Sequence, residues 1–405
     1  MEVIIEKMNH QAQGIAKVNG KVVFIPKVII GDIVDINIIK EYKNYSIGRV
    51  NRIIKKSSKR EEVRCPYYNS CGGCNISAYS YSDELKYKLD KVVDIFKRGG
   101  LSINPQIIES DNRYEYRNKI TIQVDNGKIG LYEEESNKLV DINKCLLISD
   151  RLNEIFVIIK KNINVNKCNK IVLRDTYYGI MVIFYGSVNE KEVIKYLSDK
   201  VVSIYTYSNA YKLIYKDRYL YERIGDYKYQ ISPDSFFQVN SSTVNKLYNK
   251  VLEYATRDGK KDSLIDLYCG TGTIGIYLSK YFNNIIGIEL NKQAIMDARE
   301  NAKINNVNNI TFYEGDVSRI INDKFIADVI VVDPPRSGLD KHTKNILLKI
   351  KADKIVYVSC NPITLVRDIK DLDDGYKLED ITLVDMFPNT YHVESVCVLN
   401  LHQSV

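Results

Sequence analysis

A cysteine at the end of an apolar run is the residue of this sequence best placed for covalent chemistry. Cys360 follows the β-forming residues 356–359 and precedes Asn361 and Pro362. Because proline cannot donate to a strand ladder, the strand is expected to stop here and to present the thiol at its end. A thiol in this place suggests a nucleophile, although a buried packing residue is the commonest role of a free cysteine.

Three further cysteines within ten residues indicate metal ligation. Cys65, Cys71 and Cys74 have the spacing Cys-x5-Cys-x2-Cys, with two glycines in the loop. A zinc site would want a second cysteine or histidine pair, and we find none. An iron–sulfur cluster is favoured over zinc because its fourth thiolate can come from far along the chain. Cys145, which follows a predicted strand and a turn, is preferred to Cys168 for that place.

A glycine loop indicates a nucleotide-type ligand. Gly270, Gly272 and Gly275 follow a predicted strand and open a helix, and Glu289 lies 19 residues after Gly270. This pattern suits both NAD and S-adenosylmethionine (SAM), since glycines allow close backbone approach and the acid accepts from ribose hydroxyls. Asp333, followed by two prolines at the end of the fourth strand, favours SAM, because a nicotinamide enzyme has no obvious use for that motif.

A doubly wound parallel sheet would position these residues. Strands are predicted at 263–268, 284–290, 310–313, 328–333 and 354–359, with helices between most of them. Gly270, Glu289, Asp316, Asp333 and Cys360 would then converge at the carboxyl ends of the strands. Two final strands, 378–386 and 393–401, have no helix between them and are expected to close one edge as an antiparallel pair.

The 405 residues predict a multidomain α/β chain. Residues 1–56 show period-two alternation and an Asn19-Gly20 turn signal, which predict a small OB-like barrel. This stretch resembles the TRAM module, an RNA-binding barrel. Residues 57–230 form a predicted central RNA-binding α+β domain that carries the cysteine loop, and within it 80–98 is expected to be a packing helix. Residues 231–405 form the predicted SAM-dependent methyltransferase domain with a Rossmann-like sheet.

Composition and charge favour a soluble globular protein. Hydrophobic residues make up 45% and charged residues 27%, the net charge is +7, and no apolar run is long enough for a membrane span. The N-terminus lacks a signal-peptide pattern, so we expect a cytoplasmic protein with reduced cysteines and no obligate protein partner. Nine basic and three acidic residues between Lys40 and Arg64 make a plausible phosphate-binding patch, or simply a solvated linker. Aromatic and basic residues alternate from Tyr114 to Lys119, which suits stacking on bases, although an edge strand would look similar.

These motifs together resemble the SAM-dependent RNA uracil-5-methyltransferase family. The resemblance is greatest to the branch with an N-terminal TRAM module and a [4Fe-4S] cluster, which acts on 23S ribosomal RNA. It covers essentially the whole chain and rests on these motifs: Cys65-x5-Cys71-Gly-Gly-Cys74, Ser235-Phe-Phe-Gln238-Val-Asn, Asp266-Leu-Tyr-Cys-Gly270-Thr-Gly272, Asp333-Pro-Pro-Arg336, Ser359-Cys360-Asn361-Pro362 and Phe387-Pro-Asn-Thr-Tyr-His-Val-Glu394-Ser.

The resemblance implies a role for each matching residue. Cys360 corresponds to the nucleophile and Glu394 to the general base. The implied SAM contacts are Gln238, Tyr268, Glu289 and Asp333, to which the crevice argument adds Gly270, Gly272 and Asp316. The implied cluster ligands are Cys65, Cys71, Cys74 and Cys145, and the candidate RNA contacts are Phe236, Arg117, Lys119 and Arg336.

One thiol and one carboxylate are the minimum set for methylating C5 of uracil. A thiolate that adds to C6 moves electron density to C5, which can then accept the methyl group, and a base must remove the C5 proton before the thiol leaves. The base must leave its stack to reach Cys360, so flipping or a single-stranded substrate is expected. The alternatives are a transfer RNA substrate, an NAD(P)-linked oxidoreductase and a non-catalytic RNA-binding or redox-sensing protein.

Overall fold

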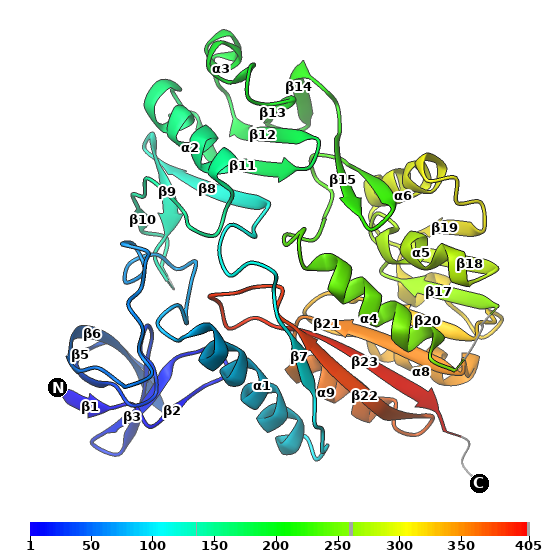
Figure 1. Ribbon diagram of the computed structural model, residues 1–405, viewed down its shortest axis with the longest axis horizontal. Helices are drawn as coiled ribbons and strands as arrows, with labels where there is room; N and C mark the ends of the chain where they lie inside the picture. The colour runs from blue at the N-terminus through cyan, green and yellow to red at the C-terminus, as the bar shows by residue number, and fades with distance from the viewer. Residues whose placement is uncertain (135, 259–261, 403–405) are drawn as a thin grey trace.

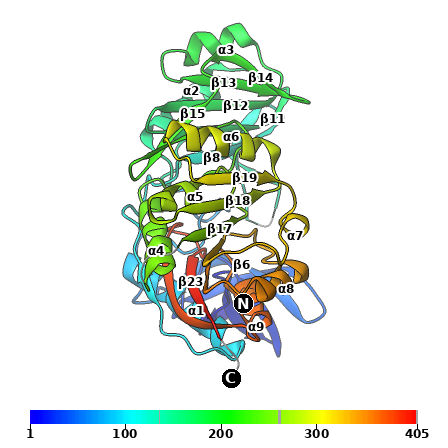
Figure 2. The same cartoon turned by 90° about the vertical axis from the view of Figure 1, so that its right-hand side faces the viewer.

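Three sheets organise the chain. The computed structural model describes residues 1–134, 136–258 and 262–402. Figure 1 shows the N-terminal strands at the lower left, the central sheet at the top and the C-terminal sheet at the right. Figure 2, turned by 90°, places the central sheet above the strands of the C-terminal sheet. No helix among the described residues is long and apolar enough to cross a membrane.

The N-terminal sheet has the strand order β1-β5-β6-β4-β3-β2. Its hairpin turn at Asn19 and Gly20 has positive φ at both residues (51° and 79°), as a type I′ turn requires. Alternate strand residues such as Val23 and Ile36 fill its interior. The strands therefore confirm the predicted period-two pattern, and their bounds are β1 Glu2–Ile4, β2 Lys7–Met8, β3 Gly14–Val18, β4 Lys21–Ile25, β5 Ile33–Glu41 and β6 Tyr45–Lys55.

The central sheet has the order β10-β9-β8-β11-β12-β13-β14 and shares a core with helices α2 and α3. A separate hairpin, β15-β16, leads from it toward the C-terminal sheet. The bounds are β8 Lys119–Asp125, β9 Lys128–Tyr132, β10 Leu139–Val140, α2 Asp150–Asn162, β11 Cys168–Thr176, β12 Gly179–Gly186, α3 Glu190–Leu197, β13 Ser203–Tyr207, β14 Tyr211–Lys216, β15 Leu220–Ile224 and β16 Tyr227–Ile231.

The C-terminal sheet has the order β19-β18-β17-β20-β21-β23-β22-β7. Strands β17 to β21 are parallel to one another, as predicted for a doubly wound sheet. The bounds are α4 Val244–Thr256, β17 Ser263–Leu267, α5 Thr273–Leu278, β18 Asn284–Glu289, α6 Lys292–Ile304, β19 Ile310–Glu314, α7 Val317–Ile320, β20 Val329–Val332, α8 Lys341–Ile350, β21 Lys354–Ser359, α9 Pro362–Asp371, β22 Tyr376–Val384 and β23 Glu394–Leu401.

The edge of this sheet differs from the prediction. β22 and β23 do form an antiparallel pair, but β23 lies inside the sheet, between β21 and β22. The edge strand is β7 (Gln106–Ile108), which pairs parallel with β22. The prediction that the last two strands close the edge is therefore wrong, because a short strand from far upstream covers β22.

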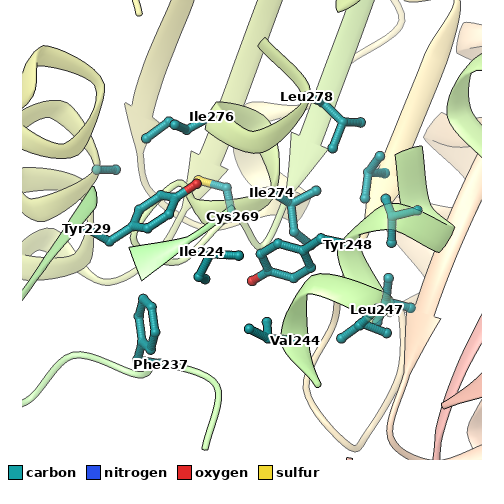
Figure 3. Close-up of a cluster of buried hydrophobic side chains, with 14 of the residues drawn as sticks. Ile224, Tyr229, Phe237, Val244, Leu247, Tyr248, Cys269, Ile274, Ile276 and Leu278 are labelled. Carbon is teal, nitrogen blue, oxygen red and sulfur yellow. The ribbon is translucent and has the colours of Figure 1, made fainter. Parts of the chain in front are cut away.

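Two cores cover the two faces of the C-terminal sheet. Successive residues of β17 point in opposite directions, so Leu264 joins the core beneath α4, α5 and α6, and Ile265 joins the core beneath α8 and α9. Figure 3 shows part of the first core, to which Tyr229, Tyr248 and Cys269 belong. Helix α1 (Tyr81–Arg98), capped by Ser80 as predicted, adds Val92 to the second core, so a helix from far upstream covers the C-terminal sheet.

Candidate active site

Two neighbouring strands bring the predicted nucleophile and base to one point. β21 ends at Ser359, β23 begins at Glu394, and their antiparallel register pairs Ser359 with Ser395. Cys360 therefore leaves its strand opposite Glu394. Pro362 not only ends the strand but starts α9, where its missing N–H costs nothing. Cys360 is half-buried, whereas Glu394 is only 6% exposed.

Burial sets the protonation of both groups. It raises the pKa of Glu394 to about 8, with the charge of Asp333 acting in the same direction. Burial and then the charge of Glu394 raise the pKa of the Cys360 thiol to about 11. Burial also raises the pKa of Asp333 to about 7. A carboxylate with a pKa raised in this way is a stronger base than an ordinary one.

Arg336 provides the positive charge at this point. The charge of its guanidinium opposes the pKa increases of Cys360 and Glu394. The guanidinium also lies within hydrogen-bonding reach of the Cys360 thiol. The Arg336 Nη2 also lies 3.4 Å from each ring nitrogen of His392. Burial, followed by the Arg336 charge, lowers the pKa of His392 to about 3, so the ring is neutral near pH 7. The predicted RNA contact Arg336 is thus also the cation nearest to the reacting groups.

A cavity of about 240 Å³ lies in front of Cys360. It is bounded by three parts of the chain: the loop between β2 and β3, helix α1, and the loops that follow β20, β21 and β22. The lining residues are His10, Gln11, Lys91, Ile95, Arg336, Cys360, Asn361, Pro362, Ile363, Tyr391 and His392.

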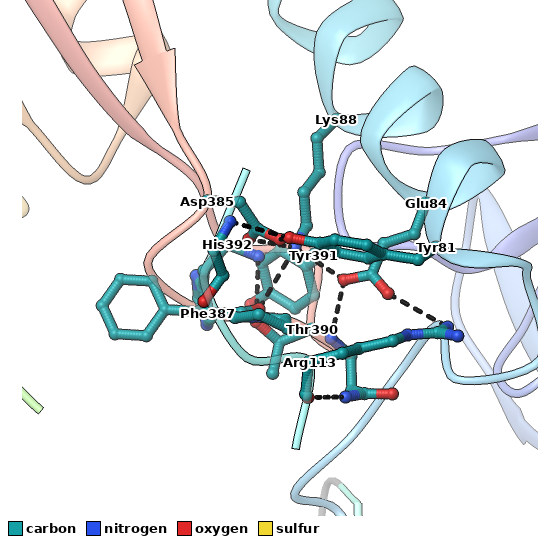
Figure 4. A network of polar contacts seen from close by, with 12 residues as sticks. Tyr81, Glu84, Lys88, Arg113, Asp385, Phe387, Thr390, Tyr391 and His392 are labelled. Atoms are coloured by element: carbon teal, nitrogen blue, oxygen red, sulfur yellow. Dashed lines mark hydrogen bonds and ion pairs between the residues drawn. The ribbon is translucent and has the colours of Figure 1, made fainter. Parts of the chain in front are cut away.

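A buried ion-pair network holds the loop that leads into Glu394. Lys88 of α1 lies 2.8 Å from Glu84 and 2.7 Å from Asp385, and it also donates to the Phe387 carbonyl at 3.1 Å. All three ionised side chains are fully buried. Figure 4 shows Lys88 reaching from α1 between Glu84 and Asp385, with His392 on the same loop. The network therefore fixes residues 385–392 against α1.

The glycine loop has the geometry that a nucleotide-type ligand requires. Gly272 has φ of 76°, and a Cβ there would lie 2.8 Å from the Phe312 ring. The Gly270 amide donates to Glu289 Oε2 at 3.1 Å, and Glu289 Oε1 accepts from the Asn291 amide at 2.7 Å. The loop and the acid at the end of β18 are therefore adjacent, as predicted.

A further acid, Asp266, lies below this loop. It is fully buried, its Oδ2 accepts from the Gly275 amide at 2.9 Å, and burial raises its pKa to about 8. The charges of Asp333 and Glu289 contribute to that increase, so the three carboxyl groups lie at one end of the sheet. Asp266 belongs to a motif of the family resemblance but is not among the predicted site residues; its place in the strand before the glycine loop is the signal that could have found it.

Three other predicted cofactor contacts lie around the crevice. Tyr268 follows β17 with φ of 61°, and its side chain pairs with Thr343 at the start of α8. Asp316 caps α7 through the Ser318 amide at 2.9 Å. The Gln238 carbonyl accepts from the Asn118 side chain, which ties this segment to the central domain.

The predicted RNA contacts do not lie together. Phe236 is 69% exposed, as an aromatic residue must be to stack on a base. Arg117 and Lys119 instead line a cavity of about 450 Å³ inside the central domain. Burial and then the nearby charge of Arg174 lower the pKa of Lys119 to about 8.

That cavity is also lined by the four predicted cluster cysteines, Cys65, Cys71, Cys74 and Cys145. All four are free thiols. Among the described lining residues there are cations but no carboxylates, and the Arg117 Nε is buried without a hydrogen-bond partner. No group of His, Cys, Asp or Glu side chains in the described residues is already arranged around a single metal ion.

Helix α1 is more than the packing helix that the sequence predicts. It supplies Glu84 and Lys88 to the buried network and Lys91 to the cavity in front of Cys360. The signal was present, because Glu84 and Lys88 are four residues apart and Val92 continues the same row into the core. Two other cysteines are packing residues as predicted: Cys269 is 6% exposed and Cys397 is fully buried.

Comparisons with known proteins agree with this geometry. The model of the family described as tRNA (uracil-5-)-methyltransferase matches residues 80–402, and the TRAM domain model matches residues 1–50. This chain belongs to the tRNA (uracil-5-)-methyltransferase family. It is therefore a SAM-dependent RNA methyltransferase, and the prediction of the family is confirmed.

Relatives match over almost the whole chain. An uncharacterized RNA methyltransferase of Halalkalibacterium halodurans is 34% identical over 99% of this chain and 97% of its own length. One from Clostridium tetani is 36% identical over 98% of this chain and 95% of its own. The crystal structure of the Pyrococcus abyssi tRNA (uracil-54, C5)-methyltransferase in complex with S-adenosyl-L-homocysteine is 30% identical, covers 98% of this chain and 100% of its own, and has a TM-score of 0.79.

Proposed function

We propose that this protein methylates C5 of a uridine in RNA through a covalent bond between Cys360 Sγ and C6 of the uracil, with Glu394 as the base. The observation that carries this proposal is the register of β21 and β23, which sets the thiol opposite the carboxylate beside one cavity. Family membership supports the uracil-5 chemistry. An oxidoreductase or a non-catalytic protein has no use for this pair.

Cys360 makes C5 reactive. The sulfur adds to C6, the C5–C6 double bond opens, and the electron pair becomes available at C5, which bonds to the methyl carbon. Thiolate is the attacking form, and Arg336 favours it because its charge lowers the pKa of the thiol. SAM supplies the electrophilic methyl group and leaves as S-adenosylhomocysteine.

Glu394 completes the reaction. After methyl transfer C5 carries both a proton and the methyl group. Glu394 takes that proton, the electron pair reforms the C5–C6 double bond, and the C6–S bond breaks to return Cys360 as thiolate. A pKa of about 8 suits a group that must accept a proton near neutral pH.

The crevice at the ends of β17, β18 and β20 would hold SAM. Glu289 ends its strand with Oε2 at the glycine loop and Oε1 at the Asn291 amide, where its carboxylate would also accept from the ribose hydroxyls. Gly270 and Gly272 would allow the ligand close to the backbone. The remaining proposed contacts are Gln238, Tyr268, Asp316 and Asp333.

Two variants test the catalytic roles by single-turnover transfer of labelled methyl from SAM to RNA. Cys360→Ala should abolish transfer while SAM affinity stays unchanged. Glu394→Gln should still methylate but stall, which leaves a protein–RNA adduct visible in denaturing gels. Cys168→Ala, which alters a buried thiol of the central core, is the matched control and should turn over normally. Near-normal turnover by Cys360→Ala would refute covalent catalysis.

The RNA substrate is proposed to be 23S ribosomal RNA, on the resemblance to the family branch with a TRAM module and four cysteines. Transfer RNA is the second candidate, favoured by the match to the Pyrococcus abyssi tRNA (uracil-54, C5)-methyltransferase. The N-terminal sheet, the basic segment from Lys40 to Arg64, Phe236 and Arg336 would contact the RNA. Mapping 5-methyluridine in ribosomal and transfer RNA from a strain lacking this protein decides between the two.

The four cysteines are proposed to hold a [4Fe-4S] cluster in the central domain. The support is the chemistry of the cavity: four free thiols, Arg117 and Lys119 to offset the negative charge of thiolates, and no lining carboxylate in the described part of the chain. The methyl transfer needs no electrons, so the role is to shape the RNA-binding domain.

Iron analysis tests the cluster. Anaerobically purified protein should be brown and contain iron, Cys145→Ser should lose most of the iron, and Cys168→Ser should keep it. Colourless protein that holds only zinc would overturn the assignment.

A further inference from the structure

The cavity in front of Cys360 is built jointly by three parts of the chain. Its far wall comes from His10 in the loop between β2 and β3 and from Lys91 and Ile95 on α1. The same three residues also line a groove of about 660 Å³ between the N-terminal sheet and α1. They therefore stand where that groove meets the cavity of the reacting thiol.

This wall is positively charged. Its positive charges are Lys91 and Arg336; the cavity is also lined by His10 and His392, whose pKa values burial lowers, and by no carboxylate of the described residues. The groove does contain acids. Those on α1 are already paired, since Asp83 lies 3.6 Å from Lys59, Asp90 3.0 Å from Lys86 and Asp94 2.8 Å from Arg98, and Glu6 between β1 and β2 is a fourth.

Lys91 lies at this junction and has hydrogen-bond donors available for a ligand. It forms no ion pair with a carboxylate of the described residues, and its ammonium group donates to the Tyr391 carbonyl. The aromatic rings of Tyr391 and Tyr87 lie 5.7 and 6.0 Å from its Nζ. An ammonium has three donors, so two remain for a ligand.

We propose that Lys91, with His10 beside it, binds a backbone phosphate next to the uridine that enters the Cys360 cavity. This inference rests on the proposed function. A nucleotide swung out of its stack draws its flanking phosphates to the mouth of the pocket. A phosphate oxygen accepts charge-assisted hydrogen bonds from an ammonium, and nothing else in an RNA chain carries the matching full charge. Helix α1 and the N-terminal domain thereby take part in holding the target nucleotide.

The site has a distinctive response to pH. Burial and then the charge of Lys88 lower the pKa of Lys91 to about 7, against the opposing charge of Asp385. The other titratable or charged groups that face it are Arg336, His10 with a pKa lowered by burial, the neutral His392, and the tyrosines 87 and 391. A bound phosphate favours the ammonium form, so affinity for RNA should fall as the pH rises above about 7.

The experiment compares Lys91→Met, Lys91→Arg and the control Lys97→Met, which changes an exposed lysine on the same helix. The probe is a short RNA that carries the mapped uridine. Lys91→Met should weaken RNA binding about tenfold and lower the slope of log affinity against log salt by about 0.7. Lys91→Arg should bind well and lose the pH dependence, because arginine stays charged. Lys97→Met should match the wild type.

A chemical substitution tests the same contact without altering the protein. RNA with an uncharged methylphosphonate at one position flanking the uridine should bind wild-type protein about as weakly as Lys91→Met binds normal RNA. Lys91→Met should lose nothing further on that RNA. Equal affinity of the wild type for both RNAs at each flanking position, or additive losses, would overturn the inference. SAM binding and methyl transfer by the wild type would meanwhile show that the proposed function stands.

Discussion

Removing the charge of Lys88 should destabilise the protein strongly. In Lys88→Met, Glu84 and Asp385 stay buried but lose the ammonium group that lies 2.8 and 2.7 Å from them. Arg113, 3.2 Å from Glu84, still faces one of the two. The remaining carboxylate charge is uncompensated away from water.

The size of the effect follows from that burial. Breaking a buried pair by removing one partner costs about 3–5 kcal/mol. An exposed i,i+4 pair such as Lys86 with Asp90, whose side chains are 65% and 56% exposed, contributes at most about 0.5 kcal/mol. Lys88→Met should therefore lose several times more unfolding free energy than Lys86→Met.

Urea unfolding of both variants measures this difference. Burial already raises the pKa of Glu84, and loss of the Lys88 charge would raise it further. Protonation of Glu84 then removes one of the two negative charges that Lys88 offsets and leaves Arg113 to balance the other, so the penalty in Lys88→Met should shrink as the pH falls from about 8 to about 5.5. A loss below about 1 kcal/mol at neutral pH, or one that grows on acidification, would show that the network does not stabilise the fold as argued.

Two further predictions concern the reaction itself. Gly272→Ala should weaken SAM binding about tenfold or more by calorimetry, because the new Cβ would meet the Phe312 ring. The control is Gly20→Ala, since Gly20 has a similar φ but lies in open space, and it should leave SAM affinity unchanged. Equal effects of the two variants would refute the steric argument. Single-turnover formation of free methylated RNA should accelerate between about pH 6 and 9, because the Cys360 thiol, with a pKa of about 11, adds to C6 as thiolate, and Glu394, with a pKa of about 8, must be deprotonated to resolve the adduct. A flat profile would contradict these roles.

The sequence predicts the C-terminal strands well because each is a short apolar run next to turn signals. β21 has the predicted bounds, and the register of β21 with β23 then places Cys360 opposite Glu394. Local pattern is enough here because the ends of parallel strands in such a sheet meet at one edge.

Contacts between distant segments escape this kind of reasoning. β7 has three residues and no periodicity of its own, and its pairing with β22 spans more than half the chain. Lys88 looks like a surface residue until Asp385, 297 positions away, is found beside it. Arg117 and Lys119 suggested an RNA surface, but only the fold shows that they face the cysteine cavity. The TRAM match to residues 1–50 confirms the identity of the first module, whereas the domain limits at 56 and 230 stay predictions.

The pairing of β7 with β22 has a consequence for how the chain matures. Gln106 leaves the ribosome long before Thr382, the residue it pairs with, so the upstream segment must wait for nearly the whole catalytic half to be synthesised. A fragment starting at residue 231 would expose the unpaired rim of β22 to other chains, and such rims invite self-association. Strand β7, from the first half of the chain, thus completes the sheet of the catalytic half, so the two halves are not expected to fold as independent parts.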